Sequence, residues 1–549
     1  MKSQTVKTFL DVHSWTGLGA GMALFIAFYT GAITVFFHEL EAWGARHTHQ
    51  IGAPAQSRDD AQLLIDLALE KNPDATALLS FYPARDDHPE HSAVWYEQFE
   101  DGTYKRHDFG LRNGELDTSG HDGNAHLAGF IYRLHYTAGL PRNVGINVLG
   151  AISLIYGLAL VTGVLVFLPN FLKDLLIVRT GRNKKRFWRD AHNVVGIVSL
   201  PWHVMFAWSS VMLTIGIFLL APFQLLVFEE NLLEKMGEEF GFVAPPEKTG
   251  HAAAMLSVGQ ILDIAEREIP GMEVTQIRYT NYGDENSMVS VFGSLGADIL
   301  DTNGSVNLLA ASGEVLAVSD PRTASFGATF YNGLIALHFV SFGGVALKWV
   351  YFLLGVAGAF MFYTGNLLWV ETRRKRRQLA QPKKTVLFAR LNSGVCIGCM
   401  AGVSAAFLAS LALTGMEQRP VFTEYAYYSV FFTGVVWCFL RPVALGTRDL
   451  LRASAVLTAL IPVFAAAYGQ VPLQQSLSSG EWVNVCIDLL AIAGAVAFWQ
   501  LARAVEVRAR SGDAHSVWSE PPTAGAAKPH RRVSNSRKES AVADAPGMP

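Results

Sequence analysis

Long uncharged stretches alternate with polar stretches along the chain. Most of the uncharged stretches reach the roughly 20 residues that a helix needs to cross a hydrocarbon core. They cover residues 16–37, 144–172, 193–228, 349–370, 391–415, 425–440, 453–473 and 482–502, the last of which contains Asp488. The first is longer than the apolar region of a signal peptide, and no small-residue cleavage site follows it. The pattern predicts an all-α polytopic membrane protein with about eight transmembrane helices.

Two polar segments, residues 39–124 and 229–325, have a different pattern. In each, apolar residues at helical spacing are followed by alternating runs and by turn-forming residue pairs. The expected elements are residues 61–70, 78–82 and 93–99 with a turn at 113–115 in the first segment, and residues 258–268, 274–280, 288–292 and 315–318 with a turn at 312–313 in the second. The pattern therefore predicts two small α+β modules, one in each segment.

The same reading divides the chain into seven parts. These are the cytoplasmic start with the first membrane helix (1–38), the first module (39–124), membrane helices two and three with a basic loop (125–228), the second module (229–325), membrane helix four (326–372), a C-terminal four-helix membrane extension (385–506) and a tail (507–549). The tail is rich in Ala, Pro, Ser and Arg, which predicts disorder.

Composition and charge add the topology. The 549 residues are 50% hydrophobic and 17% charged, with a mean hydropathy of +0.24, which excludes an ordinary soluble globule. Lys and Arg number seven in residues 173–189 and eight in residues 373–390, so both loops and both termini are expected in the cytoplasm and both modules outside. Because topology accounts for the basic residues, the expected surroundings are membrane lipid, and no nucleic-acid partner is expected. Four cysteines without regular spacing exclude a disulfide scaffold.

The chain contains an internal repeat. The spacing Asp-x-His-x-x-x-Gly occurs at 11–17 and again at 190–196, each time at the start of an apolar stretch. A Leu-His-aromatic triplet occurs at 134–136 and 337–339, and a Thr-Gly pair follows within the next apolar stretch each time. The order A-B-A′-B′ predicts two parallel repeats related by an axis along the membrane normal, which brings equivalent helices face to face.

Four histidines occupy matched positions in this repeat. His13 and His192 are expected at the cytoplasmic surface, and His135 and His338 at the outer surface. Two facing imidazoles at each surface form the ligand set of a bis-histidine haem. The sequence therefore predicts two haem sites, and the alternative is that these histidines are only interfacial polar residues.

Other residues near these histidines allow further predictions. Gly17 and Gly196, one turn after a histidine, would leave room for a porphyrin face. The acid two residues before the histidine is expected to be a favourable charge at a helix N-terminus. His203 is expected on nearly the same helix face as the second-repeat histidine, roughly 16 Å deeper. Its repeat equivalent is Leu24, so a ligand role and simple packing both stay open.

Three further residues are read as structural. His38 is assigned to the outer interface. Cys396 and Cys399 lie one turn apart among small residues, which favours helix packing over a redox or metal role.

These motifs together resemble the PepSY-associated transmembrane-helix family. The resemblance rests on His13-x-Trp15-x-Gly17, on His192-Asn193-x-x-Gly196 with Pro201-Trp202-His203, on the Leu-His-aromatic triplets and on the α+β modules. Residues 390–394 and 424–437 resemble the extension of longer members, so the resemblance covers about residues 5–505. It implies iron-regulated proteins of the bacterial inner membrane, some of them similar to di-haem reductases of ferric siderophores. It further implies haem b on His13, His135, His192 and His338, with His203 at a frequent family histidine.

The expected function is thus an inner-membrane oxidoreductase with two haem b groups that reduces a periplasmic ferric siderophore and releases the iron. The expected donor is a reduced flavin or flavoprotein at the basic cytoplasmic side. Two alternatives stay open. One is a non-enzymatic membrane protein whose modules bind or regulate a periplasmic partner, and the other is a transporter of a siderophore or another substrate.

Overall fold

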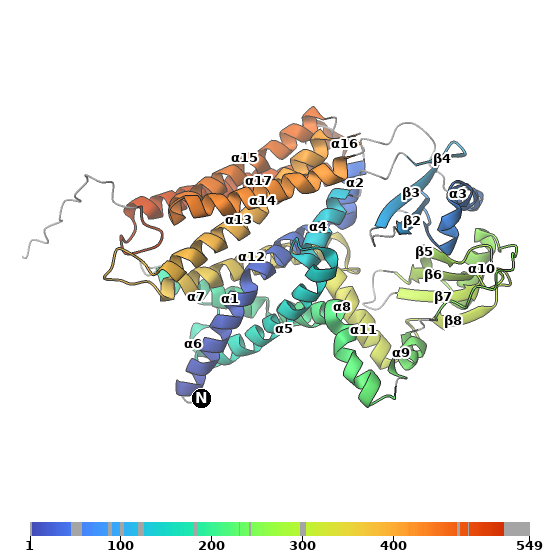
Figure 1. Cartoon of the computed structure of the whole chain (residues 1–549), viewed down its shortest axis with the longest axis horizontal. Helices are drawn as coiled ribbons and strands as arrows, with labels where there is room; N and C mark the ends of the chain where they lie inside the picture. The colour runs from blue at the N-terminus through green and yellow to red at the C-terminus, as the bar shows by residue number, and fades with distance from the viewer. Residues whose placement is uncertain are drawn as a thin grey trace, which may run out of the picture.

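The computed structural model shows a helical bundle with a β-sheet layer at one end (Figure 1). The structure describes residues 3–45, 57–85, 90–98, 104–118, 126–179, 184–229, 231–240, 243–296, 303–414, 416, 418–468, 473–480 and 482–520. Both ends of the described chain lie at the end of the bundle remote from the sheet. Most of the tail predicted to be disordered, from residue 521 onward, lies outside the described residues.

Seven helices among the described residues are long and apolar enough to cross a membrane. They are α1 (Ser3–Thr34), α5 (Arg142–Phe167), α8 (Leu200–Leu226), α12 (Gly344–Thr372), α13 (Lys383–Ala412), α15 (Val443–Ala467) and α17 (Trp482–Ser511). The expectation of about eight is therefore corrected. The remaining candidate, α14 (Arg419–Leu440), falls short because Glu424 and the tyrosines at 425, 427 and 428 lower its mean hydropathy. The chain is a multi-pass membrane protein.

Small residues let α14 pack closely beside α13. A Cβ atom at Gly394 would lie 2.9 Å from the Cα of Val435, and one at Gly402 would lie 2.8 Å from the ring of Tyr427. Such close backbone approach is how helices associate in lipid. Cys396 and Cys399 on α13 are free and fully buried, which fits the packing interpretation. Cys399 lies at the contact with α14, and Cys396 packs against Phe25 of α1 and Ala359 of α12.

Helix breaks separate the histidine segments from the long helices that follow. The stretch expected to be one helix over residues 193–228 is two, α7 (Lys184–Val198) and α8, because Pro201 begins a new helix after Ser199. Likewise α4 (His126–Thr137) precedes α5, and α11 (Phe326–Phe339) precedes α12. Ala138 and Val340 adopt positive φ at these two breaks. The shorter elements are α2 (Phe37–Ala45), η1 (Pro73–Ala77), η2 (Leu168–Asn170), α6 (Phe171–Asp174), α9 (Leu232–Phe240) and α16 (Leu473–Ser479).

The strands of both polar segments form one antiparallel sheet. They are β1 (Leu78–Tyr82), β2 (Ser92–Gln98), β3 (Tyr104–Arg112), β4 (Glu115–Asp117), β5 (Glu273–Thr280), β6 (Met288–Ser294), β7 (Asn303–Leu309) and β8 (Val315–Ser319). The strand order is β4-β3-β2-β1-β5-β6-β7-β8, so β1 of the first segment pairs with β5 of the second. The sequence pattern predicts β1, β2, β5, β6 and β8. It does not predict β3, β4 and β7, nor that the two halves join in one sheet.

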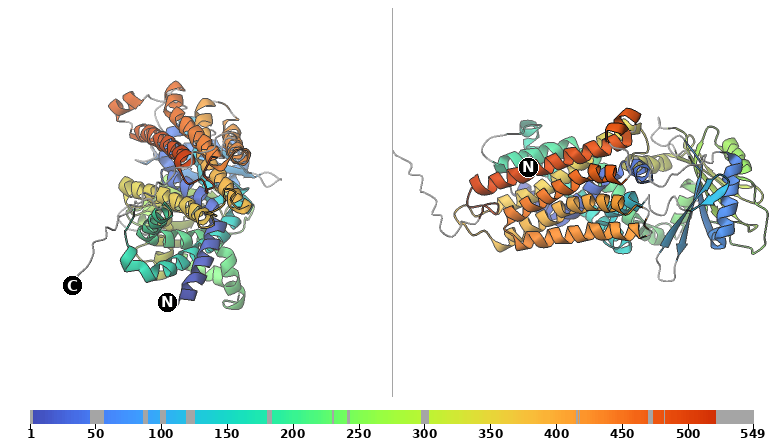
Figure 2. Two further views of the ribbon diagram at one scale, coloured as in Figure 1. Left: turned by 90° about the vertical axis from the view of Figure 1, so that its left-hand side faces the viewer. Right: turned by 90° about the horizontal axis from the view of Figure 1, so that it is seen from above.

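Two helices, α3 (Arg58–Lys71) and α10 (Val258–Glu268), cover the face of the sheet that is turned away from the bundle (Figure 2). Each begins with a capping box, formed by Ser57 with Asp60 and by Ser257 with Gln260. Inward-facing side chains of both helices and of strands from both segments make one hydrophobic core. The opposite face of the sheet is turned toward the membrane helices.

Candidate functional site: two pairs of histidines

The first pair joins α1 and α7, the two helices that carry the matched Asp-x-His-x-x-x-Gly spacing. His13 on α1 and His192 on α7 have ring centres 6.3 Å apart, with the ring planes at 72°. His13 Nδ1 donates to the carbonyl oxygen of Ala159 on α5 at 2.9 Å, and His192 Nδ1 donates to that of Met361 on α12 at 3.2 Å. The two acceptors occupy matched positions of the repeat, each four residues before a glycine. The inner pair therefore follows the repeat in its partners as well as in its position.

The second pair lies near the sheet end. His135 on α4 and His338 on α11 have ring centres 6.2 Å apart, with the ring planes at 50°. His135 Nδ1 donates to the carbonyl oxygen of Ala27 on α1 at 2.8 Å. His338 Nδ1 lies 2.6 Å from the hydroxyl of Ser209, whose proton is directed at the carbonyl oxygen of Met205 at 2.8 Å. Ser209 therefore accepts from His338.

These hydrogen bonds fix which ring nitrogen is left for a ligand. A carbonyl oxygen can only accept, so Nδ1 of His13, His135 and His192 carries the proton and their Nε2 atoms keep the lone pair. For His338 the same assignment follows because the Ser209 hydroxyl donates its one proton to Met205. Metal-bound histidines are commonly held in this way, with the second nitrogen donating to a backbone carbonyl or another acceptor. All four imidazoles are thus in the tautomer that ligates through Nε2.

The spacing of the rings agrees with one metal atom between the two members of each pair. Two imidazoles on opposite sides of an iron, with metal–nitrogen bonds of about 2 Å, have ring centres about 6 Å apart. The observed 6.3 Å and 6.2 Å match this value. Among the described residues no group of three or more His, Cys, Asp or Glu side chains could hold a metal ion. The donor set of each pair, two neutral nitrogens and no carboxylate or thiolate, fits a haem.

Two glycines that sequence reasoning used only as repeat markers make room for the inner pair. A Cβ atom at Gly163 would lie 3.0 Å from His13 Cε1, and one at Gly365 would lie 3.3 Å from His192 Cε1. Their absence lets each ring lie against the helix whose carbonyl it binds. Gly31 does the same for His135, because a Cβ there would lie 2.7 Å from His135 Nδ1. The matched Thr-Gly pairs were the available signal for the first two.

The glycines that the sequence did single out are placed differently from each other. A Cβ at Gly17 would meet nothing within 4 Å, so this residue borders open space. A Cβ at Gly196 would lie 3.3 Å from Met361 Sδ, so this residue faces α12. Their expected role beside a porphyrin stays a prediction.

His203 belongs to neither pair, although it lies close enough to His192 for their charges to interact. The break at Ser199 places it on α8 while His192 is on α7, so the expectation that the two share one continuous helix face is wrong. Its Nδ1 is hydrogen-bonded to the Tyr156 hydroxyl, and its ring centre is 5.5 Å from that of Phe28. Its buried Nε2 has no partner among the described residues. No other histidine ring in the described part of the chain is in ring contact with it.

The acids before the inner histidines do not cap helices. Helix α7 begins at Lys184 and α1 at Ser3, so both acids lie inside a helix. Asp190 is buried and pairs with Arg179 and Arg189, each at 3.3 Å. The expectation of a helix N-terminal charge is therefore wrong, and Asp190 instead anchors the basic segment to α7.

Comparison with known proteins identifies the family. An uncharacterized protein of Pseudomonas aeruginosa is 23% identical over 292 residues, which cover 51% of this chain and 70% of that protein. A family model described as the PepSY-associated TM region matches residues 10–372, which contain all four paired histidines and the whole sheet. The chain therefore belongs to the family of proteins with a PepSY-associated transmembrane region.

Proposed function

We propose that the protein is a bacterial inner-membrane electron-transfer protein with two haem b groups, one at each histidine pair, that reduces a periplasmic ferric siderophore. The observation that carries this proposal is the combination of ring spacing and Nδ1 hydrogen bonding at both pairs. Haem, when bound, supplies a centre that takes up and releases one electron. The chain's own part is to hold four Nε2 lone pairs in place and to exclude water around them.

The positions of the two pairs along α1 support a route across the membrane. His13 lies on this helix, and the carbonyl of Ala27 on the same helix holds His135. With a rise of about 1.5 Å per residue, the two pairs lie about 20 Å apart along α1. A hydrocarbon core is about 30 Å thick, so two centres divide a distance that a single one would leave open.

The sheet offers a place for the acceptor. Leu79, Phe81 and Ile277 point into the core, so the alternating residues of β1 and β5 point toward the bundle. Among these, Gln276 donates to the hydroxyls of Ser80 and Tyr82 at 3.1 and 3.2 Å. Hydroxyl and amide groups of this kind suit the oxygen-rich surface of a siderophore. Reduction weakens the hold of hard oxygen ligands on iron, and release would follow.

The topology and the donor follow from charge. The basic segments at residues 173–189 and 373–390 favour the cytoplasm for the end that is remote from the sheet, and the sheet would then be periplasmic. A reduced flavin or an acidic flavoprotein that binds these segments would be the donor to the inner pair. Both termini would be cytoplasmic.

A reduced-minus-oxidised absorption spectrum of the purified protein, with haem and iron content per chain, tests the proposal. We expect a haem b signal with two haems per chain. Neither alternative function, a partner-binding protein nor a siderophore transporter, requires that signal. A protein purified from haem-replete cells without haem would contradict the proposal.

A further inference from the structure

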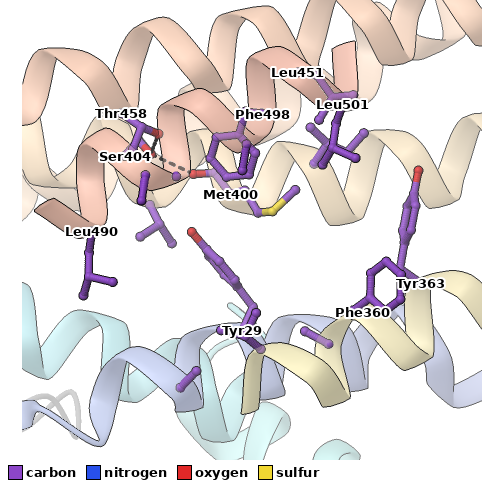
Figure 3. Close-up of a pocket in the computed structure, with 18 of the residues that line it drawn as sticks. Tyr29, Phe360, Tyr363, Met400, Ser404, Leu451, Thr458, Leu490, Phe498 and Leu501 are labelled. Atoms are coloured by element: carbon purple, nitrogen blue, oxygen red, sulfur yellow. Dashed lines mark hydrogen bonds between the residues drawn. The ribbon is translucent and has the colours of Figure 1, made fainter. Parts of the chain in front are cut away.

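An apolar cavity of about 1490 Å³ is lined by residues of α1 and α12 on one side and of the C-terminal helices α13, α15 and α17 on the other (Figure 3). Apolar side chains from both sides, among them Phe360, Met400, Phe498 and Leu501, line it. Much of this wall lies beyond residue 372, where the match to the family model ends. The histidine pairs do not use this space, so the C-terminal helices build a feature that the proposed haem sites leave unexplained.

Polar groups face this otherwise apolar space in the half nearer the sheet. The Tyr29 hydroxyl points into the cavity toward Ser404 and Thr458, whose hydroxyls lie 2.8 Å apart on the opposite wall. The Tyr29 hydroxyl has no hydrogen-bond partner among the described residues. Glu39 of α2 also lines the cavity. Its Oε1 pairs with Lys348 at 2.6 Å, while its Oε2 is buried without a described partner. An unpaired donor and an unpaired acceptor in an apolar site cost free energy that a bound ligand with matching groups would recover.

The cavity adjoins the outer histidine pair through a single helix. Tyr29, Ala32 and Ile33 line the cavity from α1, whereas Ala27 and Gly31 of the same turns lie against His135. An α-helix with its side chains is about 10 Å across. A redox-active ring beside Tyr29 would therefore be about one helix diameter from the outer pair.

We propose that the cavity binds an isoprenoid quinol, with its ring between Tyr29 and Glu39 and its apolar tail along the remaining cavity. The proposal rests on the proposed haem at the outer pair. In the reaction the quinol is oxidised to the quinone and loses two electrons and two protons. The haems that the outer and inner histidine pairs would hold would accept these electrons, one each. One proton passes to Glu39 Oε2 and the other to water at the cavity mouth.

A quinol carries two oxygens on opposite sides of one ring, so it can offer one to the Tyr29 hydroxyl and the other to Glu39 Oε2. A phospholipid tail would fill the same apolar space, but it has no group for the Tyr29 hydroxyl. The Tyr29 hydroxyl and Glu39 Oε2 therefore favour a quinol over a lipid tail. The membrane pool would then supply electrons to the outer pair independently of a soluble donor at the basic segments.

Binding is tested with the full-length protein in phosphatidylcholine nanodiscs. The probe is a benzoquinone with a decyl tail, and the readout is quenching of tryptophan fluorescence, since Trp349 and Trp482 line the cavity. We expect saturable binding that Tyr29→Phe weakens about tenfold and that Gly494→Leu also weakens, because the leucine side chain would occupy the space beside Thr458. A Cβ at Gly494 would make an ordinary contact of 3.6 Å with Thr458, so this change should leave the fold intact. The matched control is Tyr428→Phe, because this hydroxyl lies outside the cavity and donates to Gly139 O at 3.0 Å.

Three outcomes overturn the proposal: quenching that does not saturate, equal displacement by phosphatidylglycerol, or an affinity that Tyr29→Phe and Gly494→Leu leave unchanged. A second experiment mixes the protein with the corresponding quinol without oxygen and follows haem reduction, which Gly494→Leu should slow at least tenfold. Haem that is present but indifferent to quinol refutes the quinol site and leaves the proposed function standing. Saturable quinone binding by a protein without haem refutes the proposed function and the electron transfer but retains the site.

Discussion

At the scale of the residue, the hydrogen bond that an imidazole makes through Nδ1 decides that Nε2 is the atom left to bind a metal. Each of the four paired histidines gives its Nδ1 proton to an oxygen of a different helix. This holds the ring orientation and leaves Nε2 as the ligating atom. A histidine at a membrane surface that served only as a polar group would have no need of this arrangement at all four matched positions.

Single substitutions should separate the two pairs. His13→Ala and His192→Ala should each remove the same haem, because both rings belong to one site, and His135→Ala and His338→Ala should each remove the other. Haem content would fall from two to one per chain, and a redox titration would show which centre is missing. His38→Ala is the control, since its exposed ring lies 3.3 Å from Glu41 and outside both pairs. Two haems retained in His13→Ala or in His192→Ala would contradict the assignment.

A methyl group at Gly163 should weaken the inner site without touching its ligands. The Cβ of Gly163→Ala would lie 3.0 Å from His13 Cε1, so the ring must shift and its bond to the Ala159 carbonyl must lengthen. Losses of such supporting contacts commonly weaken metal binding about tenfold or more. Haem titration of protein produced without haem measures this. Gly157→Ala on the same helix is the control, because a Cβ there meets nothing within 4 Å, and equal affinity in both variants would contradict the role.

At this scale the sequence predicts the pairing of the histidines but not their hydrogen-bond acceptors. Matched spacings alone are enough to pair His13 with His192 and His135 with His338, since symmetry relates equivalent helices. The Nδ1 acceptors are beyond the reach of sequence patterns, because three of them are backbone carbonyls, which every residue possesses. The fourth acceptor is the side chain of Ser209, but nothing in its spacing relates it to His338.

At the scale of the element, hydrophobic periodicity locates helices and strands but shows neither where a helix breaks nor which strands pair. Hydropathy merges α7 with α8, because the residues on both sides of Ser199 are apolar and only Pro201 marks the new helix. The helix over 258–268 and the strand over 78–82 were predicted with the bounds observed, since their apolar spacing is regular. The β1–β5 ladder joins residues about two hundred positions apart, and no local pattern contains such a contact.

One loop of the sheet layer should make the protein sensitive to acid. Burial of Asp284 would raise its pKa, but hydrogen bonds from the backbone N–H groups of Asn286, Thr249 and Gly250 outweigh burial and lower the pKa to about 2. The unfolded carboxyl has a pKa of about 3.9. Its contribution to stability is therefore full above about pH 4 and is lost as the pH falls through the folded value.

Asp284→Asn should lower the unfolding midpoint of the protein in urea at about pH 7, and the difference from the unmodified protein should shrink toward about pH 2. Circular dichroism of the sheet signal measures both. Asp263→Asn is the control, because its pair with Arg58 at 2.8 Å is exposed and contributes little. A constant difference between neutral and acid pH would show that Asp284 acts through packing alone.

At the scale of the whole molecule, the two histidine pairs and the sheet lie in sequence along one axis of the bundle. This order predicts directional electron flow from the end remote from the sheet to the sheet. The test uses liposomes made without quinone, with a reductant and the basic segments inside and a ferric siderophore with an iron(II) chelator outside. Iron(II) should form outside, and removal of either histidine pair should slow it at least tenfold, because tunnelling over the full width of the membrane is far slower than over half of it.

The corresponding control reverses the protein in the membrane, which places the reductant beside the sheet. Undiminished reduction after loss of the inner pair would mean that the outer pair draws on another donor.

The order of the sites was predictable from hydropathy and lysine and arginine counts, whereas the cavity between α12 and the C-terminal helices was not. Its walls come from segments that are far apart in the sequence, and an empty space leaves no pattern in any one of them.

The ladder between β1 and β5 also bears on how far the two repeats can move. Four residue pairs, from Leu78 with Thr280 to Phe81 with Ile277, connect the strands of the first polar segment to those of the second. One hydrophobic core extends across this junction. Transporters built from repeats work by rocking one half against the other. In this protein such a motion would have to break the hydrogen bonds between β1 and β5, the two central strands of the sheet. A fixed joint of this kind is what the proposed electron transfer would need, because electron transfer depends on constant distances and requires no opening of the protein.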